Sequence, residues 1–140
     1  MSKGLATDAN ILLSAVFGSR TQAILDMFPG AAHLCAPAIC FEEARRNAVF
    51  IARKRCADVA EMQLAIDNLT RTIEPVEMHT LAPFEQAARP RVERRDPDDW
   101  PLIALAMATG YPIWTEDQDF FGCGIATWTT DRVALYLQQP

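Results

Sequence analysis

The sequence predicts an α/β fold, namely a three-layer α/β/α sandwich around a central parallel sheet of four to five strands. Short apolar runs alternate with longer segments of helical periodicity, and parallel strands need a crossover of this kind between them. The chain has 140 residues and is 50% apolar, so it can bury one core without disulfides or a structural metal. Because no repeat, low-complexity segment or Gly/Ser linker interrupts it, we expect a single domain over residues 1–140.

Short apolar runs bounded by polar or turn-forming residues have the character of strands. In chain order these are residues 5–7, 33–36, 73–78, 111–115 and 125–129. They supply the four to five strands of the predicted sheet.

Helices are expected between these strands. In chain order they cover residues 10–17, 21–28, 41–55, 58–69, 83–88, 100–109 and 131–138. Asp58 and Glu61 resemble the capping box of the fourth helix, and Pro90 ends the fifth. Gly110 follows the strongly apolar sixth helix as its C-terminal cap.

Targeting signals are not evident in the sequence. No stretch approaches the roughly 20 apolar residues that a membrane span needs, and the start, MSKGLATDAN, lacks the apolar core of a secretory signal. Four cysteines without CxxC spacing indicate reduced, packed thiols rather than zinc ligands or disulfides. We therefore expect a cytoplasmic protein that does not associate with membranes.

Positive charge is concentrated in two windows, although the formal net charge is −5. Nine of the thirteen basic residues lie there: Arg45, Arg46, Arg53, Lys54 and Arg55, then Arg89, Arg91, Arg94 and Arg95. An acidic protein can still bind a polyanion if its cations share one face. Composition alone favours a solvated helix face. The two windows indicate a polyanion-binding surface only if acids that could cleave a bound polyanion lie nearby.

Acidic residues stand next to several strand ends. They are Asp8 after the first strand, Glu42 and Glu43 after the second, Asp98 and Asp99 before the fourth, and Asp117 after the fourth. Functional groups of parallel α/β folds collect beyond the carboxyl ends of the strands, near the point where strand order reverses. We expect acids from these four places to meet at one edge of the sheet.

The stretch IWTEDQDFF, residues 113–121, places three carboxylates between two apolar segments. Asp suits turns and helix N-caps, but one cap explains only one of Glu116, Asp117 and Asp119. We expect Phe120 and Phe121 to return the chain to the core, so that the loop between the apolar segments is held rigidly.

In these residues the chain resembles the PIN-domain nucleases, including the VapC-like toxins of bacterial toxin–antitoxin pairs. The resemblance extends from about Leu5 to Leu137. Its elements are an early strand ending in Asp-x-Asn, a helical Glu after a Pro-led turn, an Asp before the Ala-rich helix of DDWPLIALAMATG, and a Thr-x-Asp-x-Asp-Phe box. The Asp-x-Asn motif consists of Asp8 and Asn10. The Thr-x-Asp-x-Asp-Phe box consists of Thr115, Asp117, Asp119 and Phe120.

Two acids of the motif have ambiguous registers. The spacing from Pro37 favours Glu43 over Glu42, since adjacent helical residues point about 100° apart and only one can face the site. The distance to the alanines of the helix favours Asp99, which leaves Asp98 as the helix cap and Asp96 as a turn residue. We expect Asp98 to matter less.

The resemblance implies a metal-dependent endoribonuclease. Its catalytic residues would be Asp8, Glu43, Asp99 and Asp117, with Asp8, Asp99, Asp117 and Asp119 as metal ligands. Two carboxylates 5 Å apart repel by roughly 3 kcal/mol at an effective dielectric of 20, so a cluster of four needs a cation. All-oxygen ligation favours Mg²⁺ or Mn²⁺. Such an ion would activate water for in-line attack, leaving a 5′-phosphate and a 3′-hydroxyl.

Supporting residues are also implied. Thr115 would orient a carboxylate or a bound water, and Asn10 would hold the first loop by hydrogen bonds, although both could be simple turn or cap residues. Some of the arginines near the site acids would steer a single RNA strand towards the metal. These candidate RNA-binding residues are Arg45, Arg46, Arg94 and Arg95.

Members of this family often act as toxins held by a small antitoxin protein, and they commonly form homodimers. A toxin of a type II toxin–antitoxin pair is therefore our first interpretation. A housekeeping PIN nuclease without an antitoxin remains open, as does a non-catalytic PIN module that binds nucleic acid or protein. A phosphatase with Asp8 as nucleophile is disfavoured by Asn10.

Overall fold

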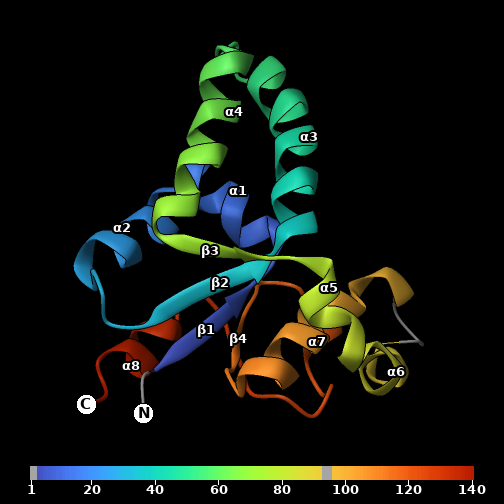
Figure 1. Ribbon diagram of the computed structural model, residues 1–140. Helices are drawn as coiled ribbons and strands as arrows, with labels where there is room; N and C mark the ends of the chain where they lie inside the picture. The colour runs from blue at the N-terminus through green and yellow to red at the C-terminus, as the bar shows by residue number, and fades with distance from the viewer. Residues whose placement is uncertain (1–2, 93–95) are drawn as a thin grey trace.

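A parallel five-stranded sheet forms the centre of the molecule, which is described by a computed structural model for residues 3–92 and 96–140 (Figure 1). The strand order is β3-β2-β1-β4-β5, and each neighbouring pair is parallel. The strands are β1 (Gly4–Thr7), β2 (His33–Pro37), β3 (Ile73–Val76), β4 (Ile113–Trp114) and β5 (Thr127–Trp128). The predicted α/β class is confirmed, with the sheet flanked by helices.

The helices follow the predicted order with adjusted boundaries. They are α1 (Ala9–Phe17), α2 (Ser19–Met27), α3 (Ala38–Lys54), α4 (Val59–Asn68), α5 (Met78–Leu81), α6 (Glu85–Ala88), α7 (Trp100–Thr109) and α8 (Val133–Leu137). The expected helix at residues 83–88 is only part of a run of short α and 3₁₀ turns between residues 78 and 91. Prolines at the starts of two of these 3₁₀ turns lack the N–H that a longer helix requires.

The two faces of the sheet carry separate apolar cores, because successive residues of a strand point to opposite faces. Leu5 and Trp114 pack with α1, α3, α4 and α8 on one face. Ala6 and Ile113 pack against α7 on the other face. Helices therefore cover both faces, which gives the expected three layers.

A hairpin of two helices, α3 and α4, projects from the layer that α1, α3, α4 and α8 form on one face of the sheet (Figure 1). Its inner side is lined by small residues of α3, and Ala44, Ala48 and Ala52 are all fully buried. Alanines at intervals of four residues lie on one side of a helix and allow a neighbouring helix to approach closely. The outer side of α3 is left to solvent.

Local signals determine the ends of several helices. The Asp58 side chain accepts a hydrogen bond from the Glu61 N–H, as an N-cap should. Gly110 has a φ of 74° and closes α7 with its N–H bonded to the Ala106 carbonyl. Both caps were predicted. The expectation that Asp98 is the cap before α7 is wrong, because Asp96 accepts the hydrogen bond of the Asp98 N–H at the start of a 3₁₀ turn, Pro97–Asp99.

Two further expectations are corrected by burial. Phe120 is buried, but Phe121 is 41% exposed and does not return to the core. All four cysteines are free thiols, and Cys56 is exposed rather than packed.

Within the described part of the chain, no helix is both long and apolar enough to cross a lipid bilayer.

Candidate metal centre

The candidate site lies where the strand order of the sheet reverses. From β1 the chain moves outward through β2 to β3, and it then returns to place β4 on the other side of β1. The carboxyl ends of β1 and β4 therefore lead their loops apart, which opens a crevice at this edge. Asp8 directly follows β1, and Thr115 directly follows β4.

Asp8 is buried and held by hydrogen bonds at both carboxylate oxygens. Its Oδ1 accepts from the Ile11 N–H at 3.0 Å, which makes Asp8 the N-cap of α1. Its Oδ2 accepts from the Thr115 hydroxyl at 2.5 Å. Each oxygen still has a second lone pair for another partner. Asp8 is thus fixed in position while it keeps its capacity to bind a cation.

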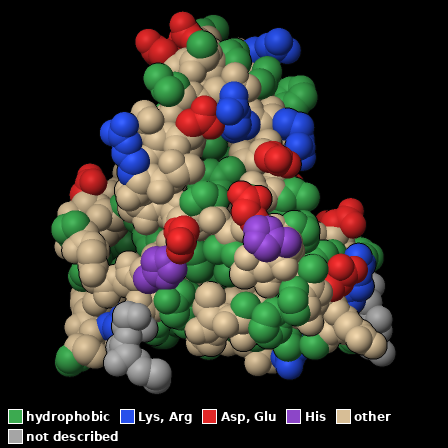
Figure 2. Space-filling view, in the orientation of Figure 1, with side chains coloured by type: hydrophobic (Ala, Val, Ile, Leu, Met, Phe, Trp, Pro, Cys, Tyr) green, Lys and Arg blue, Asp and Glu red, His purple; other side chains and the backbone are tan. Residues whose placement is uncertain are grey.

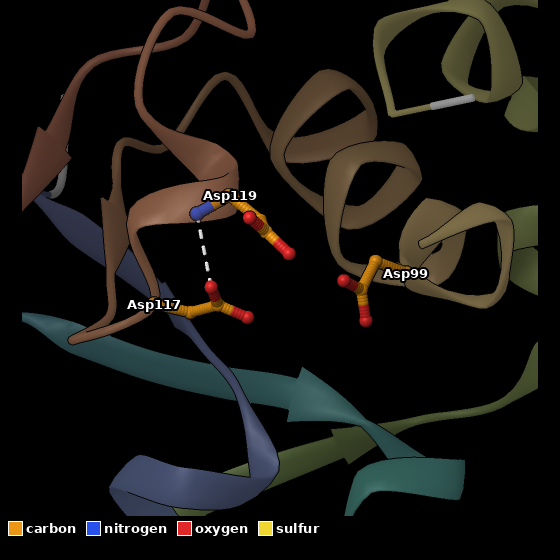
Figure 3. Close-up of side chains that lie close together, drawn as sticks. All are labelled: Asp99, Asp117 and Asp119. Carbon is orange, nitrogen blue, oxygen red and sulfur yellow. Dashed lines mark hydrogen bonds between the residues drawn. The ribbon is translucent and has the colours of Figure 1, made fainter. Parts of the chain in front are cut away.

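A chain of hydrogen bonds links Asp8 to the next acids. The Thr115 hydroxyl oxygen accepts from the Asp117 N–H at 3.0 Å, and the Asp117 Oδ1 accepts from the Asp119 N–H at 2.9 Å. Figure 3 shows the second of these bonds within the turn that carries both aspartates. Thr115 therefore orients Asp8 directly and fixes the backbone that carries Asp117.

Asp99 approaches the same point from another element, the start of α7. Carboxylate oxygens of Asp99, Asp117 and Asp119 all lie within 4.8 Å of one another. Figure 3 shows the three side chains directed into one space between α7 and the turn after β4. These acids are up to 20 positions apart in the chain, so only the fold brings them together.

Burial, together with neighbouring negative charges, makes Asp8 and Asp99 weaker acids than usual. Burial is the main cause that raises the pKa of Asp8 to about 6, against the lowering effect of its hydrogen bonds with Thr115 and Ile11. The pKa of Asp99 is raised to about 7, first by burial and then by the charges of Asp96, Asp117, Asp8 and Glu43. Ionising all of them together is unfavourable without a compensating cation.

The acids open into a cavity of about 500 Å³. Asp8, Asp99, Asp117 and Asp119 line it, and α3 contributes Cys40, Glu43 and Arg46. Glu42 is not among the described residues that line it, which fits the helix register that favours Glu43. Asp96 and Asp98, the two other acids of the segment that leads into Asp99, also line the cavity.

A divalent cation of the magnesium type fits this set of donors. Every candidate ligand is a carboxylate oxygen, which suits Mg²⁺ or Mn²⁺ and does not suit a structural zinc site. The cluster offers three acids within coordinating reach, and the cavity leaves space for the waters or phosphate oxygens that Mg²⁺ retains. The pKa of Asp99 is raised first by burial and then by the negative charges of neighbouring acids, and a bound cation would offset the second of these causes.

Comparison with known proteins decides the family. The model of the PIN domain matches residues 7–138, which is nearly the whole chain. The chain belongs to the PIN domain family. Members of this family are nucleases, and the acids described above occupy the matched region. No match is found among curated proteins.

Solved structures with the PIN fold resemble this chain over most of its length. VapBC2 from Rickettsia felis, bound to a DNA fragment from its promoter, has a TM-score of 0.68 at 12% identity, covering 89% of this chain and 97% of that chain. A toxin–antitoxin complex from Klebsiella pneumoniae has a TM-score of 0.66 at 18% identity, with 91% and 98% covered. FitAcB from Neisseria gonorrhoeae has a TM-score of 0.64 at 15% identity, with 90% and 97% covered.

Glu116 precedes Asp117 in the sequence of this PIN domain, but it is not part of the cluster of Asp99, Asp117 and Asp119. Its Oε1 accepts from the Thr130 N–H at 2.5 Å, and the Thr130 hydroxyl oxygen accepts from the Trp114 Nε1–H at 3.1 Å. Glu116 thus ties the loop after β4 to the loop after β5. The stretch of residues 113–121 therefore contains two acids directed to the site, Asp117 and Asp119, and one that braces the loop, Glu116.

The predicted RNA-binding arginines of the PIN domain have different surroundings. Arg46 lines the cavity. Arg45 forms an ion pair with Asp67 of α4, with its Nη1 3.0 Å from Oδ1, and it does not line the cavity. Of the two predicted RNA-binding arginines that the structure describes, only Arg46 therefore lies at the cavity, and RNA contact by Arg45 stays a prediction. Arg94 and Arg95 lie outside the described residues.

Asn10 lines the cavity and is exposed in the first turn of α1. Its side chain forms no hydrogen bond with another described residue, so the brace predicted for the first loop is absent there. The hydrogen bonds of Asp8 hold this loop instead.

A residue that sequence reasoning overlooked is Cys40, which lies three positions before Glu43 on the same side of α3. Burial raises the pKa of its thiol, so it stays neutral beside the acids.

Proposed function

We propose that this PIN domain is a metal-dependent endoribonuclease that hydrolyses RNA phosphodiester bonds. The proposal is supported above all by the cluster of Asp99, Asp117 and Asp119, whose carboxylate oxygens lie within 4.8 Å of one another. Membership of a nuclease family adds the reaction class. Arg46 in the same cavity provides a positive charge for a phosphate group.

Each residue of the site has a separate role in the proposed reaction. Asp99, Asp117 and Asp119 would hold one or two Mg²⁺ or Mn²⁺ ions together with Asp8. When bound, such an ion lowers the pKa of water and neutralises charge on the phosphoryl oxygens. Thr115 keeps Asp8 and the Asp117 loop in position. Glu43, across the cavity on α3, would accept a hydrogen bond from the attacking water and orient it.

The metal requirement can be tested with a mixed RNA pool. We expect cleavage in Mg²⁺ or Mn²⁺ and loss of cleavage in EDTA, with restoration when the ion is returned in excess. The fragments should carry 5′-phosphates, which a 5′-phosphate-dependent exonuclease would degrade. A protein with Asp99 replaced by asparagine, purified in the same way, controls for contaminating nucleases. Cleavage that persists in EDTA would reject the proposed chemistry.

We also propose that the domain is the toxin of a type II pair and is held by a small antitoxin protein. The similar solved structures support this, because one is described as a toxin–antitoxin complex and another as VapBC2 bound to promoter DNA. A short adjoining reading frame whose product copurifies with this chain and inhibits cleavage is the expected finding. A cytoplasmic location and a homodimer remain predictions.

A further inference from the structure

The outward face of α3 continues away from the candidate metal centre. Ile39, Glu43 and Arg46 line the cavity, and spacings of three and four residues place Phe50 and Arg53 on the same side of the helix. Lys54 lies at the edge of this face. We call the set of Arg46, Phe50, Arg53 and Lys54 the α3 track. From Arg46 to Arg53 it extends about 10.5 Å along the helix axis.

The cations of α3 divide into two groups by their contacts. Arg45 is paired with Asp67. Arg55 donates to the Phe17 carbonyl oxygen at 3.3 Å and lies over the Phe17 ring. Both are therefore engaged with the rest of the fold.

Arg46, Arg53 and Lys54 are exposed, and none of them forms an ion pair with another described residue. Figure 2 shows Lys and Arg side chains over the α3–α4 hairpin. In a chain with a net charge of −5, unpaired cations collected on the helix face that leads to the cavity are complementary to a polyanion.

Phe50 stands in the middle of these cations and is 65% exposed. The buried residues Phe41, Ala44, Ala48 and Ala52 occupy the opposite side of α3, so Phe50 does not contribute to the core. An exposed aromatic ring between cations is the arrangement with which proteins hold single-stranded nucleic acid, because an unpaired base stacks on the ring and the cations contact the backbone.

We propose that the α3 track binds a single-stranded segment of the RNA substrate next to the cleaved bond. One base stacks on Phe50, while Arg46, Arg53 and Lys54 contact phosphates. This proposal rests on the ribonuclease function proposed above, and it adds a binding surface outside the metal centre. It also limits the preferred substrate to RNA that is unpaired beside the cleavage position.

Binding of a fluorescently labelled single-stranded RNA in EDTA tests the track, because no cleavage is expected under that condition. Phe50→Ala and Phe50→Leu should each weaken binding at least about five-fold, whereas Phe50→Tyr should bind like wild type. Leucine keeps the apolar surface and removes the aromatic face, whereas tyrosine keeps both. Comparison of Phe50→Leu with Phe50→Tyr therefore separates stacking from general hydrophobic contact.

The charges of the track are tested with a double variant, Arg53→Ala with Lys54→Ala. Loss of two phosphate contacts should lower the slope of log affinity against log salt by about 1.4. The matched control is Arg20→Ala with Arg71→Ala, which removes the same charge from two exposed residues outside the cavity. The control should retain nearly the wild-type slope.

Other results would overturn the proposal. Equal RNA binding by wild type and all Phe50 variants would do so, as would an equal effect of the two double variants. If Phe50→Ala instead changes the oligomeric state in sedimentation and leaves RNA binding intact, the face contacts a protein. A wild type that binds RNA through the track but fails to cleave it in Mg²⁺ would reject the nuclease function and leave the track standing.

Discussion

Replacement of Asp99 by asparagine should lower the rate of RNA cleavage in Mg²⁺ by about a thousand-fold, which corresponds to on the order of 4 kcal/mol of transition-state stabilisation. Asparagine keeps the size of the side chain but removes the negative charge from one of three acids that lie within 4.8 Å of one another. The remaining acids would hold a divalent ion less tightly and less rigidly. Single-turnover rates at saturating Mg²⁺ measure the effect.

The neighbouring acid provides a matched control. Asp98 also lines the cavity, but it is not part of the three-acid cluster. We expect Asp98→Asn, with the same change of charge one position away, to stay within about three-fold of wild type. Full activity of Asp99→Asn, or equal losses in both variants, would contradict the assignment of Asp99 as a metal ligand.

Without divalent ions the protein should become less stable as the pH rises from about 4 to about 7. The pKa of Asp8 is raised from 3.8 to about 6, and that of Asp99 from 3.8 to about 7. A carboxyl group with a higher pKa in the folded state binds its proton more tightly when folded. Its stabilising effect is therefore present at low pH and is lost as the pH rises through the folded-state value.

The expected loss of unfolding free energy between pH 4.5 and pH 7.5 is on the order of 3 kcal/mol, after allowance for the partial exposure of Asp99. Chemical denaturation in EDTA at the two pH values measures it. Asp99→Asn serves as the control, because it cannot ionise and should lose less stability over the same interval. Equal stability of the wild type at both pH values would show that burial and mutual charge do not raise the pKa values of these acids in the folded state.

The parts of the fold that local signals determine were predictable from the sequence. The boundaries of α7 were predicted as residues 100–109 and are observed as Trp100–Thr109, because Pro101 suits a helix start and Gly110 a helix end. The lengths of β4 and β5 were not predictable. The apolar runs continue beyond them, but the paired residues are only Ile113–Trp114 and Thr127–Trp128, and pairing depends on the partner strand.

Within the site, the sequence could place an acid after a strand but could not show which acids meet. Asp8 and Asp117 follow from the positions of strand ends. The direction of Glu116 depends on the Thr130 amide, and that of Arg45 depends on Asp67. These partners come from other elements of the fold. Asp98 was misassigned as a cap because Pro97 begins a 3₁₀ turn with Asp96 as its cap.

The most direct measurement of the central claim is a calorimetric titration of Mn²⁺ into the metal-free protein at pH 7.5. We expect wild type and Asp98→Asn to bind Mn²⁺ with similar affinity, and Asp99→Asn to bind at least about ten-fold more weakly. The raised pKa of Asp99 should make binding release protons, which appears as a dependence of the heat on the buffer. Absence of binding by the wild type, or equal affinity in Asp99→Asn, would show that these acids do not form a metal centre.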